Sequence, residues 1–146
     1  MNKTIDYEAD FSAWALHNAQ LLREGKFAEL DVEHLIEELE DMGNNRQELA
    51  NRFIILIAHL LKCEYQPDNC SSSWKGSINE QRVRITRLIR NKPSLKPSLL
   101  NAIVDAYGDA VELASDDTGL AKSTFPTTCP YSPEQLLEKS FFPENK

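Results

Sequence analysis

The sequence predicts an all-α fold, an antiparallel bundle of four main helices with a C-terminal extended strap and a short terminal helix. Apolar residues recur every three or four positions over long stretches, which is typical of helices that bury one face. No long stretch shows the alternation of apolar and polar residues that predicts a strand. A chain of 146 residues suits one compact domain. We therefore expect a single domain, with the bundle in residues 1–119 and the strap and short helix in residues 120–146.

The first helix is predicted at residues 5–24, where large apolar side chains share one face and Gly25 provides a stop. The second is predicted at residues 31–64, with Asp31 as its N-cap and Pro67 just beyond its end. Gly43 weakens the middle of this helix, but the apolar spacing passes through it without a slip, so we expect a continuous helix. Its predicted apolar stripe comprises Leu35, Leu39, Met42, Leu49, Phe53, Leu56 and Leu60.

Two more long helices and a short one follow. The third is predicted at residues 72–90, and the fourth from residue 97 or 98 to about residue 119, with the turn NKPSLKP between them. After residue 120, repeated X-Pro steps predict an extended strap. Ser132, Pro133 and Gln135 have the spacing of a capping box, which predicts the start of the short terminal helix.

Three polar residues interrupt the predicted apolar faces, each on a different helix: Asn18, Arg46 and Gln81. If they lie at one level, they form a polar layer in the core, which either fixes the register of the helices or lines a small pocket. We favour the register interpretation. A buried Arg46 would require a carboxylate partner.

Charge is unevenly distributed along a chain whose net charge is −7. Residues 29–41 contain seven acidic residues and no Lys or Arg, whereas residues 74–96 contain seven basic residues and one acidic residue, Glu80. The simpler interpretation is that these two stretches pair within the chain. The alternative is an exposed charged surface that meets a partner. The overall negative charge makes nucleic acid an unlikely partner.

The composition also suggests a compartment. No apolar run approaches the roughly 20 residues that a membrane span needs, and the opening MNKTIDYEADF lacks the apolar core of a secretory signal, so we expect a cytoplasmic protein. Three cysteines without a repeated spacing favour reduced thiols over a disulfide framework. We expect no cofactor, because the sequence has no P-loop and no dinucleotide fingerprint.

Several segments carry a family resemblance: YEADFSAWALHNAQLLREGKFAELDVEHLIEELEDMG at 7–43, HLLKCEYQP at 59–67, SWKGSINEQR at 73–82 and TGLAKSTFPTTCPYSPEQLLEKSFFP near the C-terminus. With these, the chain resembles the bacterial family called domain of unknown function 29, small all-helical proteins abundant in cyanobacteria. The resemblance covers nearly the whole chain. It implies an all-helical domain and no particular reaction. At Cys63 the chain departs from the family pattern, in which tryptophan is expected.

Three classes of function remain open. No catalytic signature is present, so we favour a helical module that binds a protein partner. The first alternative is a metal-dependent enzyme, because His34 and Glu38 lie four residues apart on one helix face and can bind one ion. The second is a nucleic-acid binder that uses Arg84, Arg87 and Arg90. The candidate binding residues are His34, Glu37, Glu38, Asp41, Arg82 and Arg84, with no catalytic residue and no metal ligand assigned.

Overall fold

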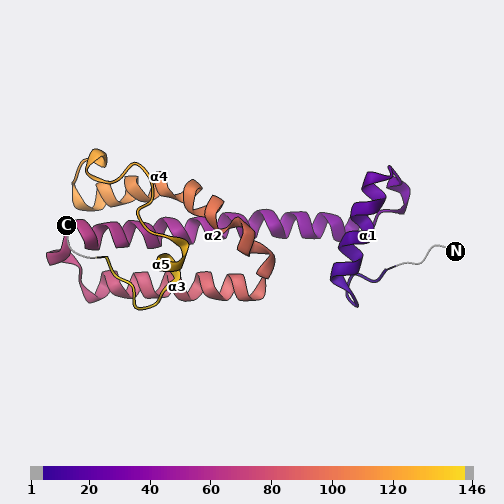
Figure 1. Ribbon diagram of the computed structural model, residues 1–146, viewed down its shortest axis with the longest axis horizontal. Coiled ribbons are helices and arrows are strands. Elements are labelled where there is room, and N and C mark those ends of the chain that lie inside the picture. Colours follow the sequence, from indigo (N-terminus) through magenta and orange to yellow (C-terminus); the bar gives the residue numbers. More distant parts are fainter. Residues whose placement is uncertain (1–4, 144–146) are drawn as a thin grey trace. The chain divides into compact units, whose positions relative to one another are not determined.

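The computed structural model describes residues 5–143, and within them every regular element is a helix (Figure 1). The prediction of an all-α fold with four main helices and a short terminal one is confirmed. Contacts divide the chain into two compact units, an N-terminal unit of residues 1–43 and a C-terminal unit of residues 44–146. The helices are α1 Phe11–Arg23, α2 Val32–Tyr65, α3 Ser72–Asn91, α4 Leu99–Thr118 and α5 Pro133–Leu137, with 3-10 turns at Phe27–Glu29, Pro67–Asn69, Pro93–Ser98 and Lys122–Thr124.

Local signals set where the first two helices begin and end. α1 begins six residues later than predicted, because the Asp10 carboxylate accepts the backbone N–H of Ala13 at 3.0 Å and caps the helix there. Gly25, at φ 69°, follows the end of α1 in the left-handed conformation that glycine adopts without strain. α2 is helical through Gly43, as the uninterrupted apolar spacing predicts.

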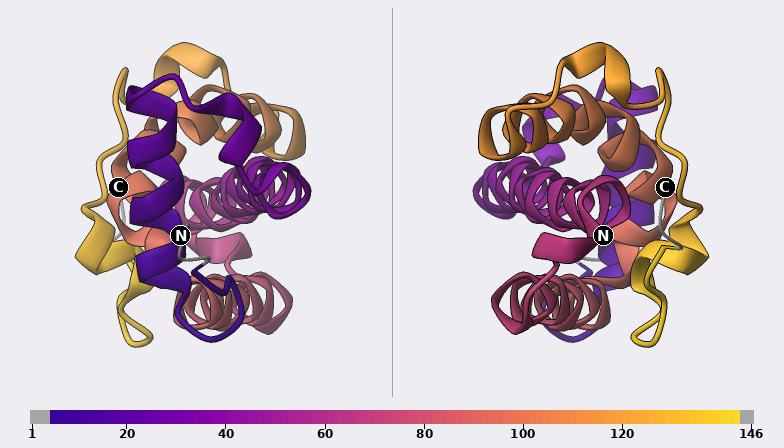
Figure 2. Two further views of the ribbon diagram at one scale, coloured as in Figure 1. Left: turned by 90° about the vertical axis from the view of Figure 1, so that its right-hand side faces the viewer. Right: turned by 90° about the vertical axis from the view of Figure 1, so that its left-hand side faces the viewer.

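In the C-terminal unit, α3 and α4 lie alongside the part of α2 that follows residue 43 (Figures 1 and 2). The apolar stripe predicted for α2 is buried here from Leu49 onward. Burial of each such side chain contributes about 1.5–3 kcal/mol, so this stripe is one substantial source of the unit's stability. The largest fully buried side chains are Leu49, Phe53, Leu56, Ile57, Leu60, Leu61, Ile78, Ile85 and Leu136.

The residues after α4 form the predicted strap. Gly119, at φ 77°, ends α4 with a left-handed cap. Phe125 and Tyr131 are buried and fasten the strap to the core. The predicted capping box of Ser132 and Gln135 is present, and it starts α5. α5 lies against both α3 and α4, so the strap closes one side of the C-terminal unit.

Arg82 holds the end of this strap. Its guanidinium donates hydrogen bonds to the backbone carbonyls of Leu136 at 2.8 Å, Gln135 at 3.1 Å and Lys139 at 3.3 Å. The residue is only 3% exposed, and burial lowers the pKa of its side chain. The expectation that Arg82 belongs to an exposed binding surface is therefore corrected: the side chain is a buried tie that satisfies carbonyls at the end of a short helix.

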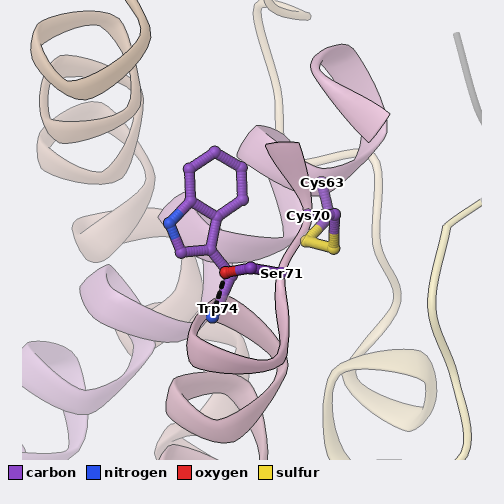
Figure 3. The surroundings of a disulfide bond; sticks show 4 residues. All are labelled: Cys63, Cys70, Ser71 and Trp74. Carbon is purple, nitrogen blue, oxygen red and sulfur yellow. Dashed lines mark hydrogen bonds between the residues drawn. A yellow bond between two sulfur atoms is a disulfide. The ribbon is translucent and has the colours of Figure 1, made fainter. Parts of the chain in front are cut away.

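A disulfide joins Cys63, near the end of α2, to Cys70, just before α3 (Figure 3). The expectation of reduced thiols is wrong for this pair. The turn at Pro67 reverses the chain and brings the two Cα atoms to 4.8 Å, within the range that a disulfide requires. Directly after the bridge, the Ser71 hydroxyl accepts the backbone N–H of Trp74 at 3.4 Å and caps α3. The bridge thus fixes the turn between two core helices.

Buried charges beside this turn are also paired. Lys62 is 4% exposed, and its ammonium contacts the Asp117 carboxylate at 2.9 Å and lies 4.4 Å from the centre of the Trp74 ring. Glu64 accepts the hydroxyl of Tyr131 at 3.3 Å. Burial and the nearby Glu64 carboxylate raise the pKa of Tyr131. These groups tie the end of α2 to α4 and to the strap.

The predicted polar layer does not form. Arg46 is exposed and therefore does not belong to the core. Gln81 is buried and accepts a hydrogen bond from Arg52 at 3.5 Å. Asn18 is also buried, and its hydrogen-bond partners lie within the N-terminal unit. The two buried amides serve separate local contacts.

Candidate functional site

The candidate site lies in the N-terminal unit, where α1 contacts the start of α2. The buried face of α1 consists of Trp14, Asn18 and Leu21. The Asn18 amide donates to the Trp14 carbonyl at 3.0 Å, and its oxygen accepts the backbone N–H of Asp31 at 2.9 Å. The residue that interrupts the apolar face of α1 therefore fixes the residue that caps α2.

Asp31 is the centre of a hydrogen-bond network. One carboxylate oxygen accepts the indole N–H of Trp14 at 2.8 Å and lies 2.7 Å from Nδ1 of His34. The other accepts the backbone N–H of His34 at 3.5 Å, which confirms Asp31 as the helix cap. The hydrogen bond to His34 lowers the pKa of Asp31, and the same bond raises the pKa of His34. The charged form of the pair is therefore favoured.

Tyr7 completes the cluster. Its ring stacks on the His34 ring with centroids 4.0 Å apart and meets the Trp14 ring edge-on at 4.8 Å. Its hydroxyl donates a hydrogen bond to Glu38, and mainly this bond raises the pKa of Tyr7 to about 12. We define the Tyr7 cluster as Tyr7, Trp14, Asp31, His34 and Glu38.

This geometry does not support a metal at His34 and Glu38. The two side chains use different partners, since His34 pairs with Asp31 and Glu38 accepts from Tyr7. In the part of the chain that the structure describes, no three His, Cys, Asp or Glu side chains are placed to hold an ion. The role of Asp31 as a partner of His34 was missed, although a carboxylate three residues before a histidine on a helix is a recognisable signal.

The outer side of α2 carries two parallel ladders of side chains. Val32, Ile36 and Leu39 are 53%, 51% and 65% exposed. At about 100° per residue, they fall within one strip of the helix surface, roughly 60° wide. An acidic strip with the same spacing lies beside it. We call these residues together the apolar-acidic face: Val32, Ile36 and Leu39 with the exposed Glu33, Glu37 and Glu40.

Exposed apolar side chains are concentrated in the N-terminal unit. Of the eleven large apolar side chains that are exposed in the described residues, eight lie before residue 44. Only Trp14 and Leu21 are buried apolar residues among the described residues of this unit. Soluble proteins rarely expose large contiguous apolar patches unless these bind something. The eight are Phe11, Leu16, Leu22, Phe27, Val32, Ile36, Leu39 and Met42.

The other predicted binding residues are distributed differently. Glu37 and Asp41 are exposed on α2, with Glu37 in the apolar-acidic face. Arg84 is exposed on α3, where its guanidinium pairs with Glu80 at 3.0 Å. With Arg82 buried under the strap, the basic face of α3 is smaller than the sequence suggests. Of the three arginines named for the nucleic-acid alternative, Arg84 thus already has a carboxylate partner, Glu80.

Comparison with known proteins places the chain in one family. No curated protein and no solved structure matches it. Within residues 5–143, no helix combines the length and apolar character needed to cross a membrane. The model of the family described as "Domain of unknown function DUF29" matches residues 7–142, which is nearly the whole chain. The chain therefore belongs to the DUF29 family.

Proposed function

We propose that this protein is a helical interaction module that binds a protein partner through the apolar-acidic face of α2. The observation that carries the proposal is the exposure of Val32, Ile36 and Leu39 in a unit whose described residues bury only two apolar side chains. Covering apolar area releases about 25 cal/mol per Å², so a partner that covers this strip gains binding energy.

The Tyr7 cluster has a supporting role in this function. Asp31 joins α1 to α2 through Trp14 and His34, and Tyr7 adds a second tie through Glu38. These contacts lie on the inner side of α2, which leaves the outer side for a partner. The cluster thus orders the helix that carries the apolar-acidic face.

Site-specific photocrosslinking tests the proposal. A photoreactive phenylalanine derivative replaces Leu39 in the full chain, and the matched control carries it at Leu100 on α4, because these leucines are 65% and 63% exposed. We expect a discrete crosslinked protein band in cells from position 39 and none from position 100. Reversing Glu37 and Glu40 to Lys is expected to remove the band. Equal crosslinking from both positions would contradict the proposal.

A further inference from the structure

We infer that the occupant of the apolar-acidic face is an amphipathic helix that carries Lys or Arg along one edge. This inference rests on the proposed function and names the class of partner. It follows from the spacing of the two ladders, from the charge of the N-terminal unit and from the absence, among its described residues, of a Lys or Arg that pairs with the acidic ladder.

The ladders have the geometry of a helix-packing surface. Val32, Ile36 and Leu39 follow the i, i+4, i+7 spacing, and the acidic ladder follows the same spacing one residue later. Each ladder rises roughly 10 Å, about two helical turns. A second helix that packs along the apolar strip therefore keeps one of its edges beside the carboxylates over the same length.

The charge of the surface specifies the edge of the partner. Residues 1–43 contain eleven acidic and three basic residues, whereas residues 44–146 contain twelve acidic and thirteen basic ones. The net negative charge of the chain thus resides in the N-terminal unit. Opposite charges on a partner would speed the encounter and favour it over neutral or acidic helices.

In the described part of the N-terminal unit, no Lys or Arg pairs with the acidic ladder. Within residues 5–43, the two basic side chains, Arg23 and Lys26, have other partners. The ammonium of Lys26 pairs with the Glu24 carboxylate at 3.1 Å, and the guanidinium of Arg23 donates to the Gln20 side chain at 3.4 Å. Like charges three and four residues apart repel on a helix. Cations placed by a partner would relieve this repulsion at the same time as the apolar strip is covered.

Two synthetic helices provide the probes. Each is a fluorescent peptide of roughly 18 residues, long enough to cover the ladders, with leucines at i, i+4 and i+7. One carries lysines beside the leucines and the other carries glutamates. We expect the full chain to bind the lysine peptide roughly tenfold or more tightly than the glutamate peptide in fluorescence anisotropy, with affinity falling as salt rises from about 50 to 500 mM.

Matched variants locate the site. The triple variant Glu33→Lys, Glu37→Lys, Glu40→Lys is expected to reverse the preference, binding the glutamate peptide and losing the lysine peptide. The control makes the same charge change on exposed residues of α4 and is expected to change neither affinity by more than about twofold. Leu39→Ser should weaken the binding of the lysine peptide to the parent and of the glutamate peptide to the triple variant. Leu100→Ser should weaken neither. The α4 control is the triple variant Asp105→Lys, Asp109→Lys, Asp116→Lys. Circular dichroism checks the helix content of every variant.

Other outcomes overturn the inference in distinguishable ways. Equal binding of both peptides would mean that charge does not select the partner. Equal effects of the α2 and α4 triple variants would place binding elsewhere. If neither peptide binds and sedimentation shows that the chain self-associates in a way that depends on position 39, the occupant would be a second copy of the chain. Crosslinking from position 39 without peptide binding would leave the proposed function standing and remove only the basic helix.

Discussion

At the residue scale, a single carboxylate connects the two helices of the N-terminal unit. Asp31 caps α2 through the backbone of His34, accepts the buried indole N–H of Trp14 and pairs with the His34 ring. The three contacts fail together if the carboxylate is removed. Trp14 is only 2% exposed, so its N–H would then lack a partner away from water.

Replacing Asp31 by Ala should destabilise the N-terminal unit by roughly 1–3 kcal/mol, through the lost cap and the unsatisfied indole. Asp31→Asn should cost less, because asparagine is also a good helix cap. Urea unfolding followed by Trp14 fluorescence in a Trp74→Phe background measures the change. Equal midpoints for Asp31→Ala and the parent would show that the network contributes nothing.

The stability of the N-terminal unit should fall at both high and low pH. The hydrogen bond to Asp31 raises the pKa of His34 above its ordinary 6.5. The stabilisation that this hydrogen bond gives through His34 is therefore complete below about pH 6.5, and it is lost as the pH rises through the raised pKa. The same bond lowers the pKa of Asp31 below its ordinary 3.8, so that contribution is present above about pH 3.8 and is lost as pH falls through the lowered value.

The measurement is the urea midpoint of Trp14 fluorescence across pH 3–9, in the Trp74→Phe background. We expect greatest stability between about pH 4 and 6.5. The variant His34→Gln should lack the loss at higher pH. Its loss at acid pH should be smaller than in the parent, because only the hydrogen bonds from Trp14 and from the backbone of residue 34 then lower the pKa of Asp31. A midpoint that does not change between pH 6 and 9 in the parent would argue against the His34 and Asp31 ion pair.

At the element scale, the two parts of α2 use the same apolar spacing for different purposes. Leu39 and Met42 are 65% and 50% exposed, whereas Leu49 and Leu56 are fully buried. Periodicity predicts a helix and its apolar face, but it does not say what covers that face. The predicted stripe is therefore correct as helix spacing, and only its later residues belong to the core.

Truncating the two kinds of leucine should separate these roles. Leu56→Ala should lower the free energy of unfolding by roughly 2–5 kcal/mol, because it leaves a cavity in a filled core. Leu39→Ala should change it by less than about 0.5 kcal/mol, as is usual for an exposed site. Urea unfolding followed by circular dichroism distinguishes them. A large loss for Leu39→Ala would mean that position 39 is covered within the free chain.

The Cys63 to Cys70 bridge should stabilise the turn between α2 and α3. Closing so short a loop contributes roughly 2–3 kcal/mol in the chain-entropy description, so the variant Cys63→Ser, Cys70→Ser should lose about this amount in urea unfolding. Cys129→Ser, at the free cysteine, is the control. Thiol titration of the unfolded parent should detect one thiol before reduction and three after. Three thiols without reductant would rule out the bridge.

At the scale of the whole molecule, the helices are predictable from local sequence, whereas the contacts that individual side chains make across the fold are not. Spacing and capping residues predict the helices, including the box at Ser132. The burial of Arg82 is not apparent in a basic run, because only the fold brings the carbonyls of the strap to it. The Cys63 bridge depends likewise on a turn. Spacing places His34 and Glu38 on one helix face, but it does not reveal that His34 contacts Asp31 and that Glu38 accepts from Tyr7.

The distribution of buried side chains predicts how each unit behaves alone. The continuous apolar core lies entirely after residue 44, so a fragment of residues 44–146 should unfold cooperatively in urea, with helix content retained. In a fragment of residues 1–43, the described residues bury only Trp14 and Leu21 as apolar side chains, and chains near 40 residues seldom fold without a staple or a partner. It should show weak helical circular dichroism and no cooperative transition. Cooperative unfolding of the short fragment would mean that the N-terminal unit does not need a partner to cover its exposed apolar side chains.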